Sequence, residues 1–399
     1  MSTRKQVAVI GLGYVGLPLA VAIANSGHFV VGIDVNSEIV RNLNLGQSHI
    51  ADIKDSEINR IIENGLFKAH DEAQSLSKCQ IILICVPTPL SNSQESDLTY
   101  VESAITLISK YLVKDQLLIL ESTVAPETTR KFLVPLVYEQ SKLQVGDLYI
   151  AFSPERIDPG NSNWNLSNTP KLLSGINSES EKIAKEFYSS FISNIHVCST
   201  IEVAETAKLL ENSFRLLNIS FINELSKFCE KLDIDINEVI DAASTKPYGF
   251  MPFRPSLGAG GHCIPVDPIY LLEKARDIGS PLKTIELAAQ INDLMPEYFI
   301  EKASNALGNL QNKKVLVVGV SYKPNISDVR ETPVERLIEG LKRQGAIVSW
   351  HDDLVKHWKG ESSVPLSTGY DLAILATPHD YLDLAKLGEV QILDTRGSI

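Results

Sequence analysis

A glycine-rich turn near the beginning of the chain constrains its fold more than any other feature. Residues 6–36 read QVAVIGLGYVGLPLAVAIANSGHFVVGIDVN, in which an apolar run, the turn, an amphipathic segment and a second apolar run follow in order. Short apolar runs with a helical pattern between them predict a βαβ unit with parallel strands. We therefore expect the chain to open with a doubly wound α/β domain.

The same turn predicts a dinucleotide site. Its glycines allow the backbone to approach a pyrophosphate at the N-terminus of the helix, where the helix dipole favours an anion. Asp34 ends the second strand 18 residues after Gly16, where a carboxylate binds ribose hydroxyls and repels a 2′-phosphate, so NAD is favoured over NADP unless Arg41 reaches the same place. Unless the turn is a tight connection without a ligand, the expected cofactor-binding residues are Gly11, Gly13, Tyr14, Val15, Gly16, Asp34 and Arg41.

Length and composition argue against several classes of protein. With 399 residues, 44% of them hydrophobic and 22% charged, the chain can form two or three globular domains. A net charge of −12 argues against a nucleic-acid-binding protein, which would carry a basic stripe. The five cysteines include no CxxC pair, so neither a disulfide framework nor a metal site is expected. Neither a signal-peptide pattern nor an apolar run near ~20 residues is found, which indicates a cytoplasmic protein without a membrane span.

The middle of the chain differs from its beginning. Further strands are expected at 81–87, 117–123 and 147–156, which complete a sheet domain of roughly 195 residues. Residues 202–231 contain no Gly or Pro and repeat apolar groups at helical spacing, which predicts one long helix. Shorter helices are expected at 236–244, 268–278 and 283–307.

The strand pattern restarts at residue 313 and echoes the first unit without its glycine fingerprint. Later strands are expected at 370–378 and 391–397. We therefore predict an α/β protein with two Rossmann-like, doubly wound parallel-sheet domains joined by a central all-helical domain with a long helix. The expected domain bounds are 1–198, 199–308 and 309–399.

Two strand ends carry hydroxyl groups. Thr88 lies in VPTP (86–89) and Thr123 in ESTV (121–124), each directly after a strand-like run. Ligands of open α/β sheets lie at the carboxyl ends of the strands, so both threonines are expected to touch the cofactor. Capping of the following helix is the alternative role.

Three polar residues share one face of the long helix. Lys208, Asn212 and Arg215 are spaced i, i+4 and i+7. A solvated face is the simple interpretation, but neighbouring leucines make much of the helix apolar, so burial is expected. Burial lowers the pKa of a lysine and suits it to acid–base chemistry, which makes Lys208 a candidate site residue.

A second glycine cluster precedes one of the cysteines. The run FMPFRPSLGAGGHCIPVDP (250–268) holds three glycines shortly before Cys263, and Asp267-Pro268 fits a helix N-cap and first helical position. Such glycines permit close approach of the backbone to a ligand. The ordinary role of a cysteine is that of a small buried hydrophobe. In a contact loop, a thiolate nucleophile with its pKa lowered by a cation such as Lys208 is the better explanation.

The motifs occur in an order that resembles one family. GLGYVGLP, VPTP, STV, SPERIDPGN, AETAKLLENSFR, GAGGHCIPVDP and GVSYKPNISDVRETP are similar to motifs of the UDP-glucose/GDP-mannose dehydrogenase family, and together they span essentially the whole chain. The resemblance implies oxidation of the C6 alcohol of a UDP-sugar to a carboxylate, with two NAD⁺ reduced in turn at one site. Cys263 would capture the intermediate aldehyde as a thiohemiacetal, which becomes a thioester that water hydrolyses.

The resemblance also implies roles for individual residues. Cys263 would be the nucleophile and Lys208 a base or oxyanion stabiliser, while Glu155 would assist thioester hydrolysis or the thiohemiacetal step. Asn212, Asp267 and Thr123 complete the expected catalytic set, with Asp267 holding a water, and Arg330 would reach the cofactor. The sugar and diphosphate would be bound by Glu155, Arg156, Ile157, Lys208, Asn212, Arg215, Arg254, Gly260 and Lys323. A homodimer through the long helix is implied as well.

The motifs SPERIDPGN and TKPYGFMPFRP (245–255) resemble those of the family branch that acts on UDP-N-acetylglucosamine, although Arg254 departs from the expected pattern. UDP-glucose, UDP-N-acetylgalactosamine and UDP-N-acetylmannosamine are the alternative substrates. Two other classes remain open. A β-hydroxyacid-type dehydrogenase would transfer one hydride and need no Cys263, and a non-catalytic sensor of NAD or nucleotide sugar would also need neither Lys208 nor Glu155.

Overall fold

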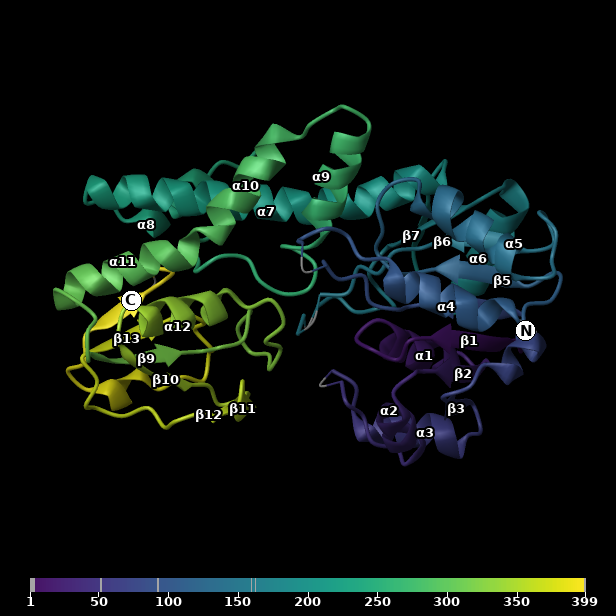
Figure 1. Cartoon of the computed structure of the whole chain (residues 1–399), viewed down its shortest axis with the longest axis horizontal. Coiled ribbons are helices and arrows are strands. Elements are labelled where there is room, and N and C mark those ends of the chain that lie inside the picture. Colours follow the sequence, from purple (N-terminus) through teal and green to yellow (C-terminus); the bar gives the residue numbers. More distant parts are fainter. Residues whose placement is uncertain (1–3, 51, 92, 159, 162, 398–399) are drawn as a thin grey trace. The chain divides into compact units, whose positions relative to one another are not determined.

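The computed structural model describes residues 4–50, 52–91, 93–158, 160–161 and 163–397, so Pro159 of the SPERIDPGN motif lies outside it. The chain divides into two compact units (Figure 1). The first comprises Met1–Leu210 and Ile269–Lys274, and the second Glu211–Pro268 and Ala275–Ile399. Within the described ranges, no helix is both long and apolar enough to cross a membrane.

The first unit is built on an eight-stranded sheet in the order β3-β2-β1-β4-β5-β6-β7-β8. The central strand shows why its sequence reads as a continuous apolar run. Val7 and Val9 enter one hydrophobic core and Ala8 and Ile10 enter the other, because both faces of the sheet are covered. The strands are β1 (Gln6–Ile10), β2 (Phe29–Ile33), β3 (Phe67–His70), β4 (Ile81–Ile84), β5 (Leu117–Leu120), β6 (Tyr149–Phe152), β7 (Lys171–Gly175) and β8 (Ile195–Val197).

Helices cover the two faces of this sheet in two groups. The core that contains Val7 and Val9 is completed by α1 (Gly16–Asn25), α2 (Ser37–Asn44), α3 (Asp55–Glu63) and α6 (Ser178–Tyr188). The opposite core is completed by α4 (Thr99–Ser109), by the π-helical turn η2 (Thr129–Leu133) that runs into α5 (Val134–Gln140), and by the start of α7 (Ile201–Lys231). A 3₁₀ turn, η1 (Gln74–Lys78), precedes β4.

The predicted fold class is confirmed, and one strand pair departs from parallel. β7 runs antiparallel to β6, with Ala151 opposite Gly175, whereas β8 again runs parallel to β7. The strands β3, β7 and β8 were not expected from sequence. β7 begins with the buried charge of Lys171 and ends at a glycine, so it carries no clear strand pattern.

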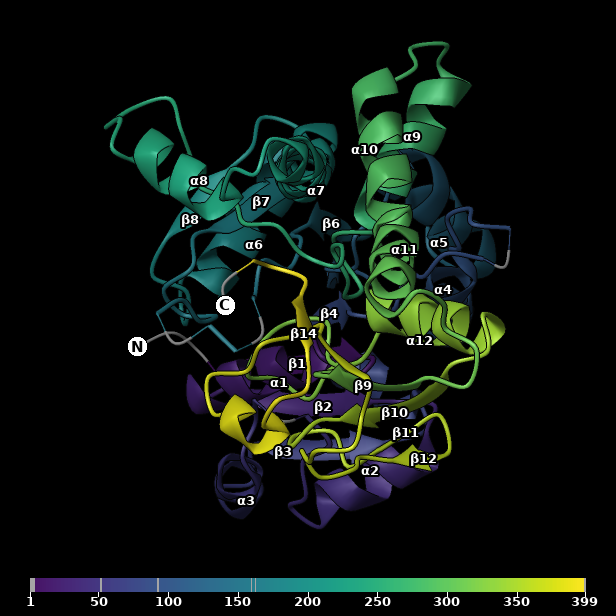
Figure 2. The same ribbon diagram turned by 90° about the vertical axis from the view of Figure 1, so that its left-hand side faces the viewer.

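The second unit contains a parallel four-stranded sheet in the order β10-β9-β13-β14. Helix α12 (Pro333–Arg343) packs against α11 (Met295–Leu307), as Figure 2 shows. Gly340 allows this close packing, since a Cβ there would lie 2.2 Å from Cδ1 of Ile300. The strands are β9 (Lys314–Val318), β10 (Ile347–His351), β13 (Leu372–Leu375) and β14 (Ile392–Asp394), with a separate antiparallel pair, β11 (His357–Trp358) and β12 (Glu361–Ser362). The helices are α8 (Ile236–Ser244), α10 (Lys283–Asp293), α11 (Met295–Leu307), α12 (Pro333–Arg343) and the 3₁₀ turn η3 (Leu384–Leu387), while α7 and α9 (Asp267–Asp277) contribute to both units.

Most of the predicted helices are confirmed, and one is wrong. The long helix expected at 202–231 is α7, whose 31 residues make a rod about 46 Å long. The single helix expected at 283–307 is instead two helices, α10 and α11, which meet at Leu294. The break follows from Pro296, because proline has no N–H to donate to the preceding turn and is tolerated only in the first turn of a helix.

Candidate active site

Glycine is required at each of the three positions of the dinucleotide turn for a different physical reason. Gly11 adopts φ +88°, a conformation that favours glycine, and a Cβ on Gly16 would lie 1.8 Å from the carbonyl oxygen of Gly11. A Cβ on Gly13, by contrast, would meet no protein atom within 4 Å. Gly11 therefore makes the turn, Gly16 allows the helix to pack against it, and Gly13 leaves the space in which a pyrophosphate lies in such sites.

Asp34 is held beside this turn. Its Oδ2 accepts the N–H of Leu12 and its Oδ1 accepts the N–H of Asn36, both at 2.9 Å. A carboxylate can accept about four hydrogen bonds, so the half-buried group keeps lone pairs for ribose hydroxyls. Val15 precedes α1 without a side-chain cap in the described chain. The N–H of Leu17 donates to the carbonyl oxygen of Gly13 at 3.0 Å and Pro18 has no N–H, so Gly16 supplies the N–H in the first turn that can face an anion. These groups fit NAD.

The other residues expected to bind the cofactor differ in solvent exposure. Tyr14 is 39% exposed, and the exposed Arg41 guanidinium lies 3.8 Å from Glu38. Thr88 is buried and Thr123 is half-buried. The next helices begin with other N-cap residues, Leu98 and Thr128, so neither threonine has the capping role that was the alternative.

A buried carboxylate fixes the backbone just after Thr123. Glu205 of α7 accepts the N–H of Glu127 at 2.6 Å and the N–H of Thr129 at 2.9 Å. Burial raises the pKa of Glu205 to about 7, although the two N–H donors oppose the shift. The start of the long helix therefore anchors the strand end that is expected to face the cofactor.

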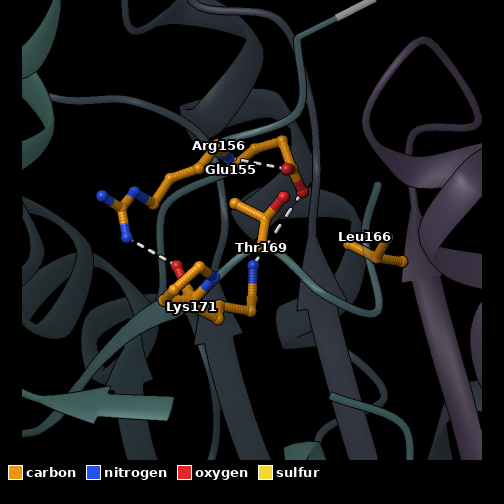
Figure 3. Close-up of a pocket in the computed structure, with 6 residues that line it drawn as sticks. Glu155, Arg156, Leu166, Thr169 and Lys171 are labelled. Carbon is orange, nitrogen blue, oxygen red and sulfur yellow. Dashed lines mark hydrogen bonds and ion pairs between the residues drawn. The ribbon is translucent and has the colours of Figure 1, made fainter. Parts of the chain in front are cut away.

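Glu155 lies in a small pocket after β6 (Figure 3). Its Oε1 accepts the N–H groups of Arg156 and Ile157, each at 2.6 Å. Its Oε2 points toward Lys171, whose Nζ lies 3.9 Å away. The Arg156 side chain donates from Nη1 to the carbonyl oxygen of Pro170 at 2.5 Å. One carboxylate oxygen is thus fixed by the backbone while the other faces a cation.

The polar stripe on α7 is partly buried, as the leucines suggested. Lys208 and Asn212 are buried, whereas Arg215 is exposed. Asn212 donates from Nδ2 to Oδ2 of the buried Asp267 at 2.5 Å. The N–H of Asp267 donates in turn to the carbonyl oxygen of Cys263 at 2.9 Å. The cysteine loop is therefore tied through Asp267 to the middle of the long helix.

Cys263 differs from the other cysteines. Its thiol is exposed, whereas those of Cys79, Cys85, Cys198 and Cys229 are buried, and none of the five forms a disulfide. Burial raises the pKa of Cys79 to about 11 and that of Cys85 well above its usual value, which keeps both as inert thiols. Exposure therefore marks Cys263 as the cysteine available to a substrate.

The glycines before Cys263 have a reason that the sequence did not reveal. A Cβ on Gly260 would lie 2.7 Å from the carbonyl oxygen of Glu331, and one on Gly261 would lie 2.8 Å from the ring of Tyr322. The N–H of Gly261 donates to the carbonyl oxygen of Arg330 at 3.1 Å. These glycines let the cysteine loop pack against residues 322–333. The close backbone approach that the sequence predicted is therefore made to another part of the protein.

The remaining basic residues of the predicted site lie in the second unit. Lys323 is half-buried, and Arg330 forms a forked ion pair with Asp328 at 2.6–3.0 Å. Arg254 donates to Oδ1 of Asn237 at 2.9 Å and pairs with Asp241. Within this chain, Arg254 thus ties the loop to the first turns of α8.

A small cavity of about 20 Å³ opens at the carboxyl ends of β9, β13 and β14. It adds Arg396, which sequence reasoning missed, although the run ILDTRG places this residue directly after an apolar strand. The lining residues are Ser256, Leu257, Gly258, Ser321, Tyr322, Pro333, Val334, Ala376, Thr377 and Arg396. The cavity lies at strand ends, where ligands of open α/β sheets bind, and Arg396 in its lining brings a positive charge that suits an anionic group.

The turn after β9 repeats the backbone geometry of the dinucleotide turn. Gly319 adopts φ +81°, and its N–H donates to the carbonyl oxygen of His351 as that of Gly11 does to Ile33. The N–H of Val320 donates to Oδ2 of Asp352 at 2.9 Å, as that of Leu12 does to Asp34.

The carboxylate of Asp352, unlike that of Asp34, is fully buried. His379 lies 3.1 Å from it through Nε2, and Nδ1 of His379 accepts the N–H of Asn325 at 2.9 Å. Because Nδ1 accepts, Nε2 carries the proton and donates to Asp352. In the second copy of the motif, the carboxylate therefore binds protein groups and is not open to a ligand.

Comparison with known proteins agrees with this arrangement. Residues 5–192, 202–294 and 316–399 match the NAD binding, central and UDP binding domains of the UDP-glucose/GDP-mannose dehydrogenase family. A UDP-N-acetyl-D-glucosamine 6-dehydrogenase of Pseudomonas aeruginosa is 35% identical, over 97% of this chain and 94% of that protein. A UDP-N-acetyl-D-mannosamine dehydrogenase of Methanococcus maripaludis is 34% identical, over 97% and 89%.

A solved structure of the UDP-D-ManNAc dehydrogenase from Pyrococcus horikoshii superimposes with a TM-score of 0.90 at 31% identity, covering 98% of this chain and 95% of that one. Both the sequence and the fold are therefore matched along nearly their whole length. The chain belongs to the UDP-glucose/GDP-mannose dehydrogenase family and is an NAD-dependent enzyme of that family.

Proposed function

We propose that this enzyme oxidises the C6 alcohol of a UDP-sugar to the carboxylate in two hydride transfers. The observation that carries the proposal is the exposed Cys263, fixed in a loop that Asp267 ties to the long helix. A dehydrogenase that stops at the aldehyde needs no nucleophile, whereas continued oxidation to the acid requires a covalent adduct or a hydrate.

The proposed reaction passes through an aldehyde, a thiohemiacetal and a thioester. The alcohol loses a hydride to NAD⁺ and a proton to a base, which gives the aldehyde. The Cys263 sulfur adds to the aldehyde carbon, and the resulting thiohemiacetal loses a second hydride and a proton to give a thioester. Water then adds to the thioester carbonyl, the C–S bond breaks, and the acid leaves with the thiol restored. NAD supplies the hydride acceptor for both oxidations.

The residues around these steps fall into three roles. Lys208, buried on α7, serves as the base or stabilises the oxyanion. The bonded pair of Asn212 and Asp267 holds a water near the cysteine loop. Glu155, with one oxygen facing a pocket rather than the backbone, assists the hydrolysis of the thioester.

The substrate is proposed to be a UDP-N-acetylhexosamine. UDP-N-acetylglucosamine is favoured by the motif wording and by the Pseudomonas relative. UDP-N-acetylmannosamine is the second candidate, because the Methanococcus relative and the Pyrococcus structure carry that name. The cavity that includes Arg396 is proposed to receive the UDP moiety.

The stoichiometry of NADH tests this proposal. Each of UDP-glucose, UDP-N-acetylglucosamine, UDP-N-acetylgalactosamine and UDP-N-acetylmannosamine is supplied in limiting amount, and NADH is followed to completion by absorbance. Two NADH per molecule of the preferred sugar are expected. One NADH would indicate a single-step dehydrogenase of the β-hydroxyacid type, and none with any sugar would indicate a binding protein.

We also propose a homodimer that forms through α7. Val203, Leu210, Phe214, Phe221 and Phe228 follow one another at intervals of four or seven residues and are 43–60% exposed. Side chains at this spacing make one stripe along a helix. An exposed apolar stripe of this length on a soluble enzyme calls for a partner surface, and a second α7 supplies a complementary one.

Charge placed in this stripe should separate the subunits. The double variant Phe221→Glu and Phe228→Glu is expected to elute and sediment with the mass of one chain, while the unaltered protein has the mass of two. Val145→Glu introduces one such charge at an apolar residue 82% exposed and outside α7, so it should leave the dimer intact. An unaltered protein that is monomeric at micromolar concentration would contradict the proposal.

A further inference from the structure

A buried group of charges lies behind Glu155. Lys171, the first residue of β7, has a side chain only 4% exposed, and its Nζ lies 2.7 Å from Oε2 of the fully buried Glu121. The hydroxyl of the buried Tyr188 donates to the other oxygen of Glu121. The Tyr188 ring also faces Nζ, with the centroid 5.2 Å away. Glu121 and Tyr188 therefore fix the position of Lys171 from two sides.

This group reaches the reactive carboxylate. The Nζ of Lys171 also lies 3.9 Å from Oε2 of Glu155, an oxygen that is buried and has no hydrogen-bond partner among the described residues (Figure 3). At that distance the ammonium stabilises a negative charge but forms no direct hydrogen bond. The lone pairs of Oε2 are thus not used by a hydrogen bond from the described residues.

The same space contains other ionisable groups. Glu121 reaches it from the end of β5, and Cys85 from the end of β4, where burial raises the thiol pKa well above its usual value and keeps it uncharged. Arg156 directs its guanidinium to the carbonyl oxygen of Pro170. Without Lys171, two buried carboxylates would face each other, and one of them would take up a proton.

We propose that Lys171 is a positioning residue of the reaction, which Glu121 and Tyr188 fix so that its ammonium stabilises the negative charge of Glu155 and leaves Oε2 to accept a proton. This inference rests on the proposed role of Glu155 in thioester hydrolysis. No motif in the sequence singles out Lys171, because an isolated lysine at the start of a short strand has the pattern of a surface residue. Its function follows from burial and from the two carboxylates beside it.

Three variants separate this role from a structural one. Lys171→Met removes the cation, Lys171→Arg retains it, and the double variant Lys171→Met with Glu121→Gln removes both charges of the buried pair. The double variant no longer leaves Glu121 as an uncompensated charge, so it should unfold at a higher temperature than Lys171→Met alone. It still lacks the cation beside Glu155.

The expected kinetic result is a loss in kcat with little change in the KM for UDP-sugar or NAD. At neutral pH, kcat for acid formation should fall about tenfold or more in Lys171→Met and in the double variant, because both lack the cation beside Glu155, and the pH profile of kcat should differ from that of the unaltered enzyme. Lys171→Arg should keep most of the activity. Thermal unfolding of each variant is measured in parallel.

Two outcomes would overturn the inference. Wild-type kcat and pH profile in the double variant would mean that the pair only supports the fold, and a Lys171→Met variant that folds with unchanged kcat would mean the same. Glu155→Gln distinguishes failure of the proposed function. If Glu155→Gln forms acid at the wild-type rate, Glu155 takes no part in thioester hydrolysis, and the proposed function of Glu155 is wrong. If it is defective while the double variant is not, only the role of Lys171 is wrong.

Discussion

Replacement of Cys263 by alanine should abolish formation of the carboxylic acid while the fold and NAD binding persist. The thiol is exposed and lies in a loop that glycines and Asp267 fix independently of the sulfur, so its removal leaves no cavity in a core. Loss of a nucleophile lowers the rate of a covalent mechanism by about 10³-fold or more. At most, aldehyde should leak from the first step, with one NADH per molecule released.

The products of Cys263→Ala are identified by mass spectrometry, with a carbonyl-trapping reagent present to collect aldehyde. Cys229→Ala is the matched control, because Cys229 of α7 is buried in a small core that α7 forms with α8, and its change should affect stability alone. Acid formed by Cys263→Ala at the rate of the unaltered enzyme would rule out the thioester route.

The second large effect is expected at Gly16. A Cβ there would lie 1.8 Å from a backbone oxygen that no rotamer change can move, so Gly16→Ala must displace either the turn or the helix. Overpacking of this kind costs about 1–3 kcal/mol of stability, and the displaced turn should lose measurable affinity for NAD. Thermal unfolding without NAD and NAD titration by calorimetry measure the two effects.

Gly13→Ala provides the matched comparison within the same turn. Its Cβ would meet no protein atom within 4 Å, so the unfolding temperature without NAD should stay that of the unaltered enzyme. The added methyl group would instead occupy the space of the pyrophosphate and weaken NAD binding about tenfold or more. Unchanged NAD affinity in Gly13→Ala would show that the pyrophosphate does not lie over this residue.

The parts of the fold that the sequence predicts are those with strong local signals. The βαβ opening, Asp34 and the long helix follow from hydrophobic period and glycine spacing, and each is present. The break at Leu294 was missed by the prediction of one helix over 283–307, although Pro296 is a local signal for it. The antiparallel direction of β7 was not predictable, because neighbouring strands across a sheet carry no local pattern that states their direction.

The candidate site likewise contains residues that the sequence indicates and residues that it does not. Cys263, Lys208 and Asn212 stand in distinctive runs, and their exposure or burial agrees with the roles proposed for them. Lys171 and Glu121 are separated by 50 residues in sequence and meet only because β5, β6 and β7 are neighbours in the sheet. The interaction depends on tertiary packing, which residue spacing does not encode.

The buried contact between Asp352 and His379 has a consequence for the order of events in turnover. The second Rossmann-like turn keeps the backbone geometry of the first, but its carboxylate is buried against His379, so of these two described turns the one at Asp34 has the carboxylate that can bind a ribose. If each sugar consumes two molecules of NAD, they must occupy that turn in succession. The enzyme then exchanges spent for fresh cofactor while the half-oxidised sugar stays bound, and the bond to Cys263 becomes a tether that outlasts the exchange.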